Sequence, residues 1–80
     1  MGTVVESGVP TIDLKRTGEN IIALRKRAGL SVTDLSEALG FTRPQAVYRW
    51  QQGRSLPTVD NLVILAYLLG VTIDEILVLN

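Results

Sequence analysis

The chain contains no cysteine and no histidine among its 80 residues. Without cysteine it forms no disulfide and offers no thiolate to a metal ion. Without histidine it lacks the usual general base and the commonest metal ligand. Most nucleophile–base pairs and transition-metal sites are therefore excluded. We expect no enzyme activity, no catalytic residue, no metal site, no cofactor and no small-molecule ligand.

Long apolar segments are also missing. No uninterrupted run approaches the ~20 residues that a membrane-spanning helix needs. The amino terminus has no charged stretch leading into an apolar one, which is the pattern of a secretion signal. These two observations and the lack of cysteine favour a cytoplasmic protein with no membrane partner. A chain of 80 residues is expected to form one domain.

An excess of either charge is absent, because eight basic and eight acidic residues cancel. A zero net charge argues against binding nucleic acid through bulk charge. The distribution is uneven, however. Residues 41–56 contain arginine without any acid, and residues 57–80 contain acids without any base, the charged residues being Arg43, Arg49, Arg54, Asp60, Asp74 and Glu75. This pattern indicates a basic centre and an acidic end, although a scatter of solvated charges is the simpler alternative.

What the sequence does contain is a repeated signal for the start of a helix. Five times, serine or threonine is followed three residues later by a polar side chain, which is the pattern of an N-cap. Only Thr42–Gln45 and Thr72–Glu75 match the reciprocal capping box strictly. With the glycines that follow, the pattern predicts helices over Thr17–Ala28, Ser31–Leu39, Thr42–Gln52, Thr58–Leu69 and Thr72–Leu79.

Apolar residues recur at helical spacing within these ranges, and no segment alternates as a strand does. In the third range Val47 and Trp50 share the inner face. The spacing of Trp50 with Val47 favours a core residue over a base-stacking one. Hydrophobic residues make up 46% of the chain, which fits either a dense core or apolar surface that a partner covers. The sequence predicts an all-α, compact five-helix domain over residues 17–80.

Residues 1–16 do not follow the helical pattern and are expected to form a short flexible arm. Glycine and proline interrupt this segment, with valines between them. The alternative is a short strand over Thr3–Glu6 that pairs with a partner chain.

The second and third helical ranges, SVTDLSEALGFTRPQAVYRWQQG, have the order helix, glycine-containing turn, helix. This stretch resembles the helix-turn-helix unit of the Cro/phage-repressor (XRE) family, and here the unit covers residues 31–52. The similarity extends to NIIALRKRAGLS before it and LPTVDNLVILAYLLGVTIDEIL after it. The segment TRPQAVYRWQQGRSLP resembles small regulators of Gram-positive bacteria.

The chain departs from the family pattern at two places. The interval from Gly40 to Gly53 is one residue longer than usual, with Pro44 in the first turn of the third helix. Proline is tolerated there, but it disfavours helical angles at Arg43, so that Arg43 could replace Thr42 as the cap. Many relatives also carry glutamate where this chain has Gln51, and the change makes the region more basic.

The resemblance implies that the third helix, residues 43–52, enters the DNA major groove. With Val47 and Trp50 inward, the residues expected to contact base edges are Arg43, Gln45, Ala46 and Arg49. Glutamine pairs with adenine, arginine with guanine, and an alanine methyl contacts thymine. Alternatively, Gln45 is engaged in capping Thr42, and Arg49 is simply solvated or binds phosphate.

Backbone phosphates are expected at helix amino ends and at basic or hydroxyl side chains nearby. Arg54, in the loop after the third helix, is the strongest candidate, and Tyr48 either contacts phosphate or packs against the core. The full set is Ser31, Thr33, Tyr48, Arg54, Thr58 and Asn61. The family tends to pair the arginine at the position of Arg25 with an acid, and Glu37 is the expected partner.

The function expected from the resemblance is sequence-specific binding of double-stranded DNA by a repressor-like transcriptional regulator. Because relatives bind two half-sites as two-fold dimers, we expect a homodimer. The apolar end of the last helix, Leu77, Val78 and Leu79, is the expected dimer interface. The alternative is a protein-interaction module of the same fold, such as an antitoxin or an anti-repressor.

Overall fold

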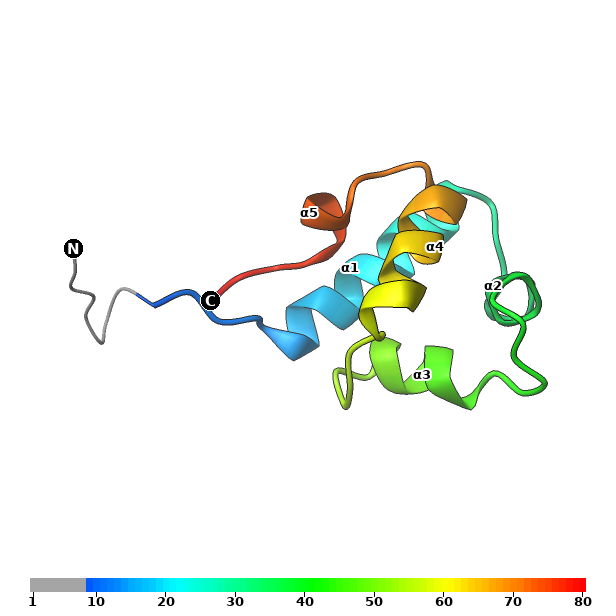
Figure 1. The fold of residues 1–80 in the computed structure, drawn as a ribbon, viewed down its shortest axis with the longest axis horizontal. Helices are drawn as coiled ribbons and strands as arrows, with labels where there is room; N and C mark the ends of the chain where they lie inside the picture. Colours follow the sequence, from blue (N-terminus) through cyan, green and yellow to red (C-terminus); the bar gives the residue numbers. More distant parts are fainter. Residues whose placement is uncertain (1–8) are drawn as a thin grey trace.

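The structure, a computed structural model, describes residues 9–80 and is all-helical over this range, apart from one isolated β-bridge (Figure 1). The helices are α1 (Leu14–Arg27), α2 (Val32–Ala38), α3 (Gln45–Gln51), α4 (Val59–Leu69) and α5 (Ile73–Ile76). Helix α1 packs mainly against α3, and α5 contacts both α1 and α4. Figure 1 shows α3 at the lower edge of the molecule and α2, seen end-on, beside the start of α3. The predicted all-α, five-helix class is confirmed. Within residues 9–80, no helix combines the length and the apolar character needed to cross a membrane.

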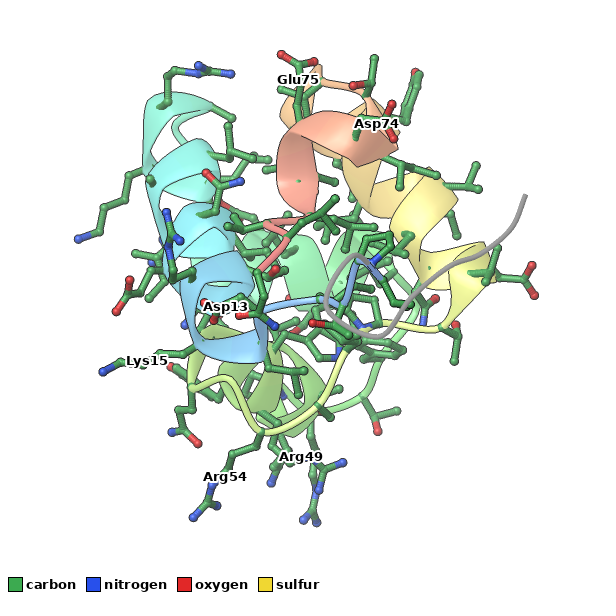
Figure 2. The ribbon with its side chains drawn as sticks, turned by 90° about the vertical axis from the view of Figure 1, so that its left-hand side faces the viewer. Asp13, Lys15, Arg49, Arg54, Asp74 and Glu75 are labelled. Carbon is green, nitrogen blue, oxygen red and sulfur yellow. The ribbon has the colours of Figure 1, made fainter. Side chains whose placement is uncertain are left out.

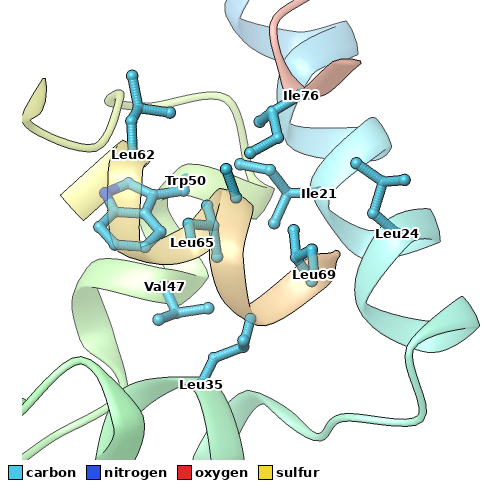
Figure 3. Close-up of a cluster of buried hydrophobic side chains, with 10 residues drawn as sticks. Ile21, Leu24, Leu35, Val47, Trp50, Leu62, Leu65, Leu69 and Ile76 are labelled. Carbon is cyan, nitrogen blue, oxygen red and sulfur yellow. The ribbon is translucent and has the colours of Figure 1, made fainter. Parts of the chain in front are cut away.

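One apolar core joins all five helices (Figure 3). The predicted inward residues of α3 are both buried, with Val47 0% and Trp50 4% exposed. The Phe41 ring, in the turn before α3, meets the Trp50 ring edge-on at 5.9 Å between centroids. Because each helix is too short to be stable alone, burial in this shared core holds the helices in place. The core residues are Ile21, Leu24, Leu35, Val47, Trp50, Leu62, Leu65, Ala66, Leu69 and Ile76.

Capping explains where α2, α4 and α5 begin. Ser31 and Thr72 each accept a hydrogen bond from the backbone N–H three residues later, and the acid at that position accepts one from the cap's own N–H. These two reciprocal boxes pair Ser31 with Asp34 and Thr72 with Glu75. The Thr58 hydroxyl caps α4 in the simpler way, accepting from the N–H of Asn61 at 3.3 Å.

The predicted start of the first helix was wrong. Helix α1 begins at Leu14, and its cap is Asp13, whose carboxylate accepts a hydrogen bond from the Arg16 N–H at 2.9 Å. Thr17 lies inside the helix and is 1% exposed. Its hydroxyl oxygen accepts a hydrogen bond from the Val78 N–H at 2.9 Å, 61 residues away in the sequence. A buried hydroxyl needs a partner, and the tertiary structure supplies one that the local pattern does not contain.

The predicted arm therefore ends earlier than residue 16. Residues 11–13 pair with the carboxyl end of the chain: Ile12 and Leu79 form an antiparallel bridge, and the Asp13 N–H donates to the Val78 carbonyl at 2.8 Å. The Asn80 side chain donates to the Thr11 hydroxyl at 2.7 Å. The alternative strand at Thr3–Glu6 lies outside the described residues.

The last helix is shorter than predicted. It ends at Ile76, and Leu77 has extended backbone angles, so residues 77–79 are not helical. Asn20 of α1 explains this end, because its side-chain amide donates to the carbonyls of Glu75 and Ile76 at 2.7 and 2.9 Å. These bonds satisfy carbonyls that a longer helix would have used internally.

Helices α1 and α3 approach unusually closely at Gly18. A Cβ atom at this buried position would lie 2.4 Å from the Trp50 carbonyl oxygen and 2.7 Å from that of Gln51. Only a residue without a side chain leaves room for the last turn of α3. This contact fixes the distance between α1 and the last turn of α3, and so the position of the outer face of α3.

We predict that Gly18→Ala destabilises the protein, because the new methyl group overlaps backbone atoms that cannot rotate away. Overpacking of this kind costs ~1–3 kcal/mol or more, which thermal or urea unfolding would measure. Glu19→Ala is the matched control, since Glu19 is exposed on the same helix and should change stability by less than ~0.5 kcal/mol. A Gly18→Ala variant as stable as the control would contradict the close approach.

Acid should weaken the box at α5. The hydrogen bonds from Thr72 hold the pKa of Glu75 below its ordinary value of 4.5. A lowered pKa in the folded state stabilises the fold above pH 4.5, and this contribution is lost as the pH falls through the lowered pKa. We predict that Glu75→Gln is less stable than the parent at pH 7 and that the difference shrinks on acidification. A difference that stays constant with pH would contradict this.

Candidate nucleic-acid interface

Helix α3 is held by a sharp turn on each side. Gly40 precedes it with φ 81° and Gly53 follows it with φ 74°, conformations that residues with a side chain rarely adopt. After the helix, the Arg54 N–H donates to the Arg49 carbonyl at 2.9 Å. This bond ties the loop containing Arg54 to the last turn of α3, so that the two arginines keep a fixed backbone relationship.

The outer face of α3 is polar and exposed. Gln45 and Arg49 lie one turn apart on this face and are both exposed, opposite Val47 and Trp50. Gln52, seven residues after Gln45, is exposed as well. The same helical spacing places Gln52 on this face, but the sequence analysis did not include it. Arg43 is exposed in the turn before the helix.

The capping role considered for Gln45 is wrong. Pro44 is the N-cap residue of α3, and no side chain caps this helix. The predicted Thr42–Gln45 box does not form, and Arg43 does not replace Thr42 as cap. Proline keeps its own backbone near φ −86° and has no N–H to be satisfied. The side chain of Gln45 makes no hydrogen bond within residues 9–80, so its amide group is available to an external partner.

Ala46 and Tyr48 differ from the expectation in opposite ways. Ala46, predicted to point outward, is half-buried and packs against the core. It has less surface to offer than Gln45 or Arg49. Tyr48 is 46% exposed, so the residue is not fully packed against the core.

Two arginines of α3 and the loop after it lie far from the two acids of α5 (Figure 2). Figure 2 shows Arg49 and Arg54 pointing away from one end, while Asp74 and Glu75 lie at the opposite end. No carboxylate oxygen within residues 9–80 lies within 4.0 Å of a lysine or arginine nitrogen. The arginines at the α3 end are therefore not neutralised by ion pairs with the described part of the chain.

The helix amino ends expected to bind phosphate are not equivalent. At α2, the Asp34 carboxylate accepts from the Ser31 N–H at 2.8 Å and so occupies the site that an anion would take. The hydrogen bonds from Ser31 also keep the pKa of Asp34 below its usual range, so the carboxylate is charged at neutral pH. This charge disfavours phosphate at Ser31, while Thr33 remains exposed. At α4, Thr58 is exposed and Asn61 is half-buried.

Comparison with known proteins agrees with this geometry. The helix-turn-helix family model matches residues 21–76, most of the described chain. The chain belongs to the XRE-type helix-turn-helix family. None of the curated protein sequences compared with this helix-turn-helix chain matches it significantly.

Solved structures include similar helix-turn-helix proteins. The BldD DNA-binding domain from S. venezulae is 30% identical, with a TM-score of 0.69 over 82% of this chain and 97% of that one. The restriction-modification controller protein C.AhdI from Aeromonas hydrophila is 26% identical, with a TM-score of 0.71 over 80% and 96%. The clp gene regulator ClgR from C. glutamicum, 17% identical with a TM-score of 0.71 over 86% and 87%, shares the fold.

In this helix-turn-helix chain Arg25 has two neutral hydrogen-bond partners. The predicted pairing of Arg25 with Glu37 is wrong. The Arg25 Nε donates to Gln51 Oε1 at 3.0 Å and its Nη1 donates to the Leu30 carbonyl at 2.9 Å. These bonds connect α1 to the end of α3 and to the loop before α2. Because both acceptors are neutral, the charge of Arg25 is not cancelled at this junction.

We predict that Gln51→Glu stabilises the fold by about 1 kcal/mol at neutral pH, because a carboxylate makes a stronger hydrogen bond to a guanidinium than an amide does. Thermal unfolding would measure the effect. Gln52→Glu is the matched control, since it adds the same charge at the exposed neighbouring residue. Equal stability changes in the two variants would contradict the prediction that the bond from Arg25 is stronger to a carboxylate at residue 51.

Proposed function

We propose that this protein is a transcriptional regulator that binds double-stranded DNA sequence-specifically, in a repressor-like manner, with α3 in the major groove. The central observation is the outer face of α3, where Gln45 and Arg49 are exposed and the former has no capping partner. Val47 and Trp50 fix the opposite face in the core. The family match supports the same function, as do the similar structures of the C.AhdI controller protein and the BldD DNA-binding domain.

The chemistry of the exposed side chains suits base edges. The glutamine amide donates one hydrogen bond and accepts another, as adenine requires, and arginine donates two to guanine. Arg49 and Arg43 are therefore proposed to contact guanine, Gln45 adenine, and the exposed part of Ala46 a thymine methyl. Base contacts of this kind supply sequence preference, whereas phosphate contacts supply position and affinity.

Arg54 is the strongest proposed phosphate contact. It is exposed, and it extends from the same end of the molecule as Arg49 (Figure 2). Thr33, Tyr48 and Thr58 are exposed residues with a hydroxyl group, which is able to donate to a phosphate. Ser31 and Asn61 complete the proposed set of phosphate contacts. The adjacent Asp34 carboxylate weakens phosphate binding at Ser31.

Selection from a randomised duplex library tests the proposal. We expect the parent protein to enrich one motif, and its affinity for that motif to fall linearly on a log–log plot against salt, with a slope near −0.9 for each neutralised phosphate. Gln45→Ala should lose preference at one base pair, by ~1–3 kcal/mol. Glu37→Ala, at an exposed position on α2, is the control that should keep the motif.

Two outcomes would contradict this. A Gln45→Ala variant that selects an unchanged motif would remove that residue from base recognition. A parent protein that binds no duplex even in dilute buffer would favour the alternative function, a protein-interaction module such as an antitoxin or anti-repressor.

We also propose that the chain binds DNA as a homodimer. Of the three residues expected at the interface, Leu77 packs against the core and Val78 is half-buried, whereas Leu79 is 54% exposed. A second apolar surface lies on the outer face of α4, where Val59, Val63 and Tyr67 are 74%, 55% and 83% exposed. These three residues are spaced by one turn each and form a continuous stripe.

The direction of α4 makes this stripe a suitable surface for a second copy. Figure 1 shows α4 starting beside α3 and running away from it. A two-fold axis parallel to α4 would place both α3 helices on the same side, as binding to two half-sites requires. The only charged residue of α4 is Asp60, so that two identical stripes can meet with little repulsion.

Sedimentation of the complex at saturation should show two chains for each selected duplex. Two variants locate the contact: Val63→Ser for the α4 stripe and Leu79→Ser for the carboxyl end. Loss of a buried apolar side chain of this size costs ~1.5–3 kcal/mol, so the correct variant should raise the dimer dissociation constant more than about tenfold. A single chain on each duplex would contradict the homodimer.

A further inference from the structure

The first turn of α1 lies directly against the loop that follows α3. A Cβ atom at Gly53 would be 2.7 Å from the Cα of Lys15 and 3.0 Å from its backbone nitrogen. Because Gly53 also has a positive φ of 74°, both its conformation and this contact exclude a side chain. The contact joins two segments that are far apart in the sequence and places Lys15 beside Arg54.

Two positive side chains extend from the segments that meet at this backbone contact. Lys15 and Arg54 are both exposed. Asp13, the nearest acid in the sequence, uses a carboxylate oxygen to cap α1 at the Arg16 N–H. Glu19 lies one turn further along α1, and no carboxylate of residues 9–80 comes within 4.0 Å of the Lys15 ammonium. The Lys15 ammonium is therefore available to an external anion.

The two cations lie next to the proposed DNA surface. Figure 2 shows Arg49 and Arg54 at one end of the molecule and Lys15 extending sideways from the first turn of α1, close to that end. From Arg49 through Arg54 to Lys15, positive charge therefore continues past the edge of α3 onto a different helix. A nucleic-acid backbone offers anions at regular intervals along such a line.

We infer that Lys15 binds a backbone phosphate of DNA beyond the base pairs that α3 faces, next to the phosphate bound by Arg54. This inference rests on the proposed function. A lysine ammonium is a mobile point charge on a flexible stem, which suits a phosphate that needs no bidentate geometry. Lys15 then adds affinity without sequence preference, and it extends the contacted stretch of DNA past the helix-turn-helix unit.

The test compares salt dependence among the full-length parent, Lys15→Gln, Arg54→Gln and Lys26→Gln. Lys26 is the matched control, because it is exposed in the last turn of the same helix, at the other end from Lys15. Binding is measured by fluorescence anisotropy on the selected duplex and on a scrambled one, over a series of potassium chloride concentrations. Thermal unfolding checks that each variant keeps the fold.

Lys15→Gln is expected to reduce the magnitude of the log–log salt slope by about 0.9, as one lost phosphate contact should. The reduction should be equal on both duplexes, and Lys15→Gln combined with Arg54→Gln should lower the slope by about twice as much. Ethylation interference should lose one phosphate, outside the selected motif, in the Lys15→Gln complex.

Two results would overturn this inference and leave the proposed function intact. The first is a salt slope in Lys15→Gln equal to that of the parent protein. The second is an equal reduction of the salt slope in Lys26→Gln, which would indicate a general charge effect. A parent protein that binds no duplex would overturn the proposed function and this inference with it.

Discussion

The contact between α1 and the carboxyl end of α3 determines the geometry of the proposed interface. Gly18 lets the carbonyls of Trp50 and Gln51 approach to a distance that a methyl group would block. Gly53 does the same for the loop that follows, against Lys15. Because both contacts involve backbone atoms, they resist small rearrangements of side chains. The outer face of α3 and the loop with Arg54 are thus fixed relative to α1, the longest helix.

The same helix also fixes the carboxyl end. Thr17 and Asn20 of α1 bind backbone groups of Val78, Glu75 and Ile76. Arg25, nearer the end of α1, binds Gln51 and the Leu30 carbonyl. One helix thus uses an apolar face for the core and several polar side chains to position α3, α5 and the chain end. A net stability of only ~5–15 kcal/mol is typical of small domains, so each of these hydrogen bonds contributes a noticeable share.

The zero net charge of the chain conceals a local group of positive charges in the folded molecule. Arg49 and Arg54 both lie at one end (Figure 2). Such a group attracts a polyanion even when the total charge of the molecule is zero. Zero net charge and DNA binding are therefore compatible in this protein.

Local patterns in the sequence determined the number and order of the helices and the inward faces of α3. Val47 and Trp50 were correctly placed in the core, because helical spacing is fixed by the backbone. The caps at Ser31, Thr58 and Thr72 were found for the same reason, since a cap and its partner are three residues apart. The family resemblance, too, rests on short segments in a fixed order.

Only the tertiary structure decided features that depend on distant residues. Thr17 looked like a cap, yet it is buried and bound to Val78, because a hydroxyl takes whichever partner the fold brings to it. Gln51, and not Glu37, is the partner of Arg25, and the backbone of Lys15 lies against Gly53. Sequence spacing cannot predict such pairs, since they follow from how helices pack and not from the periodicity of any one helix.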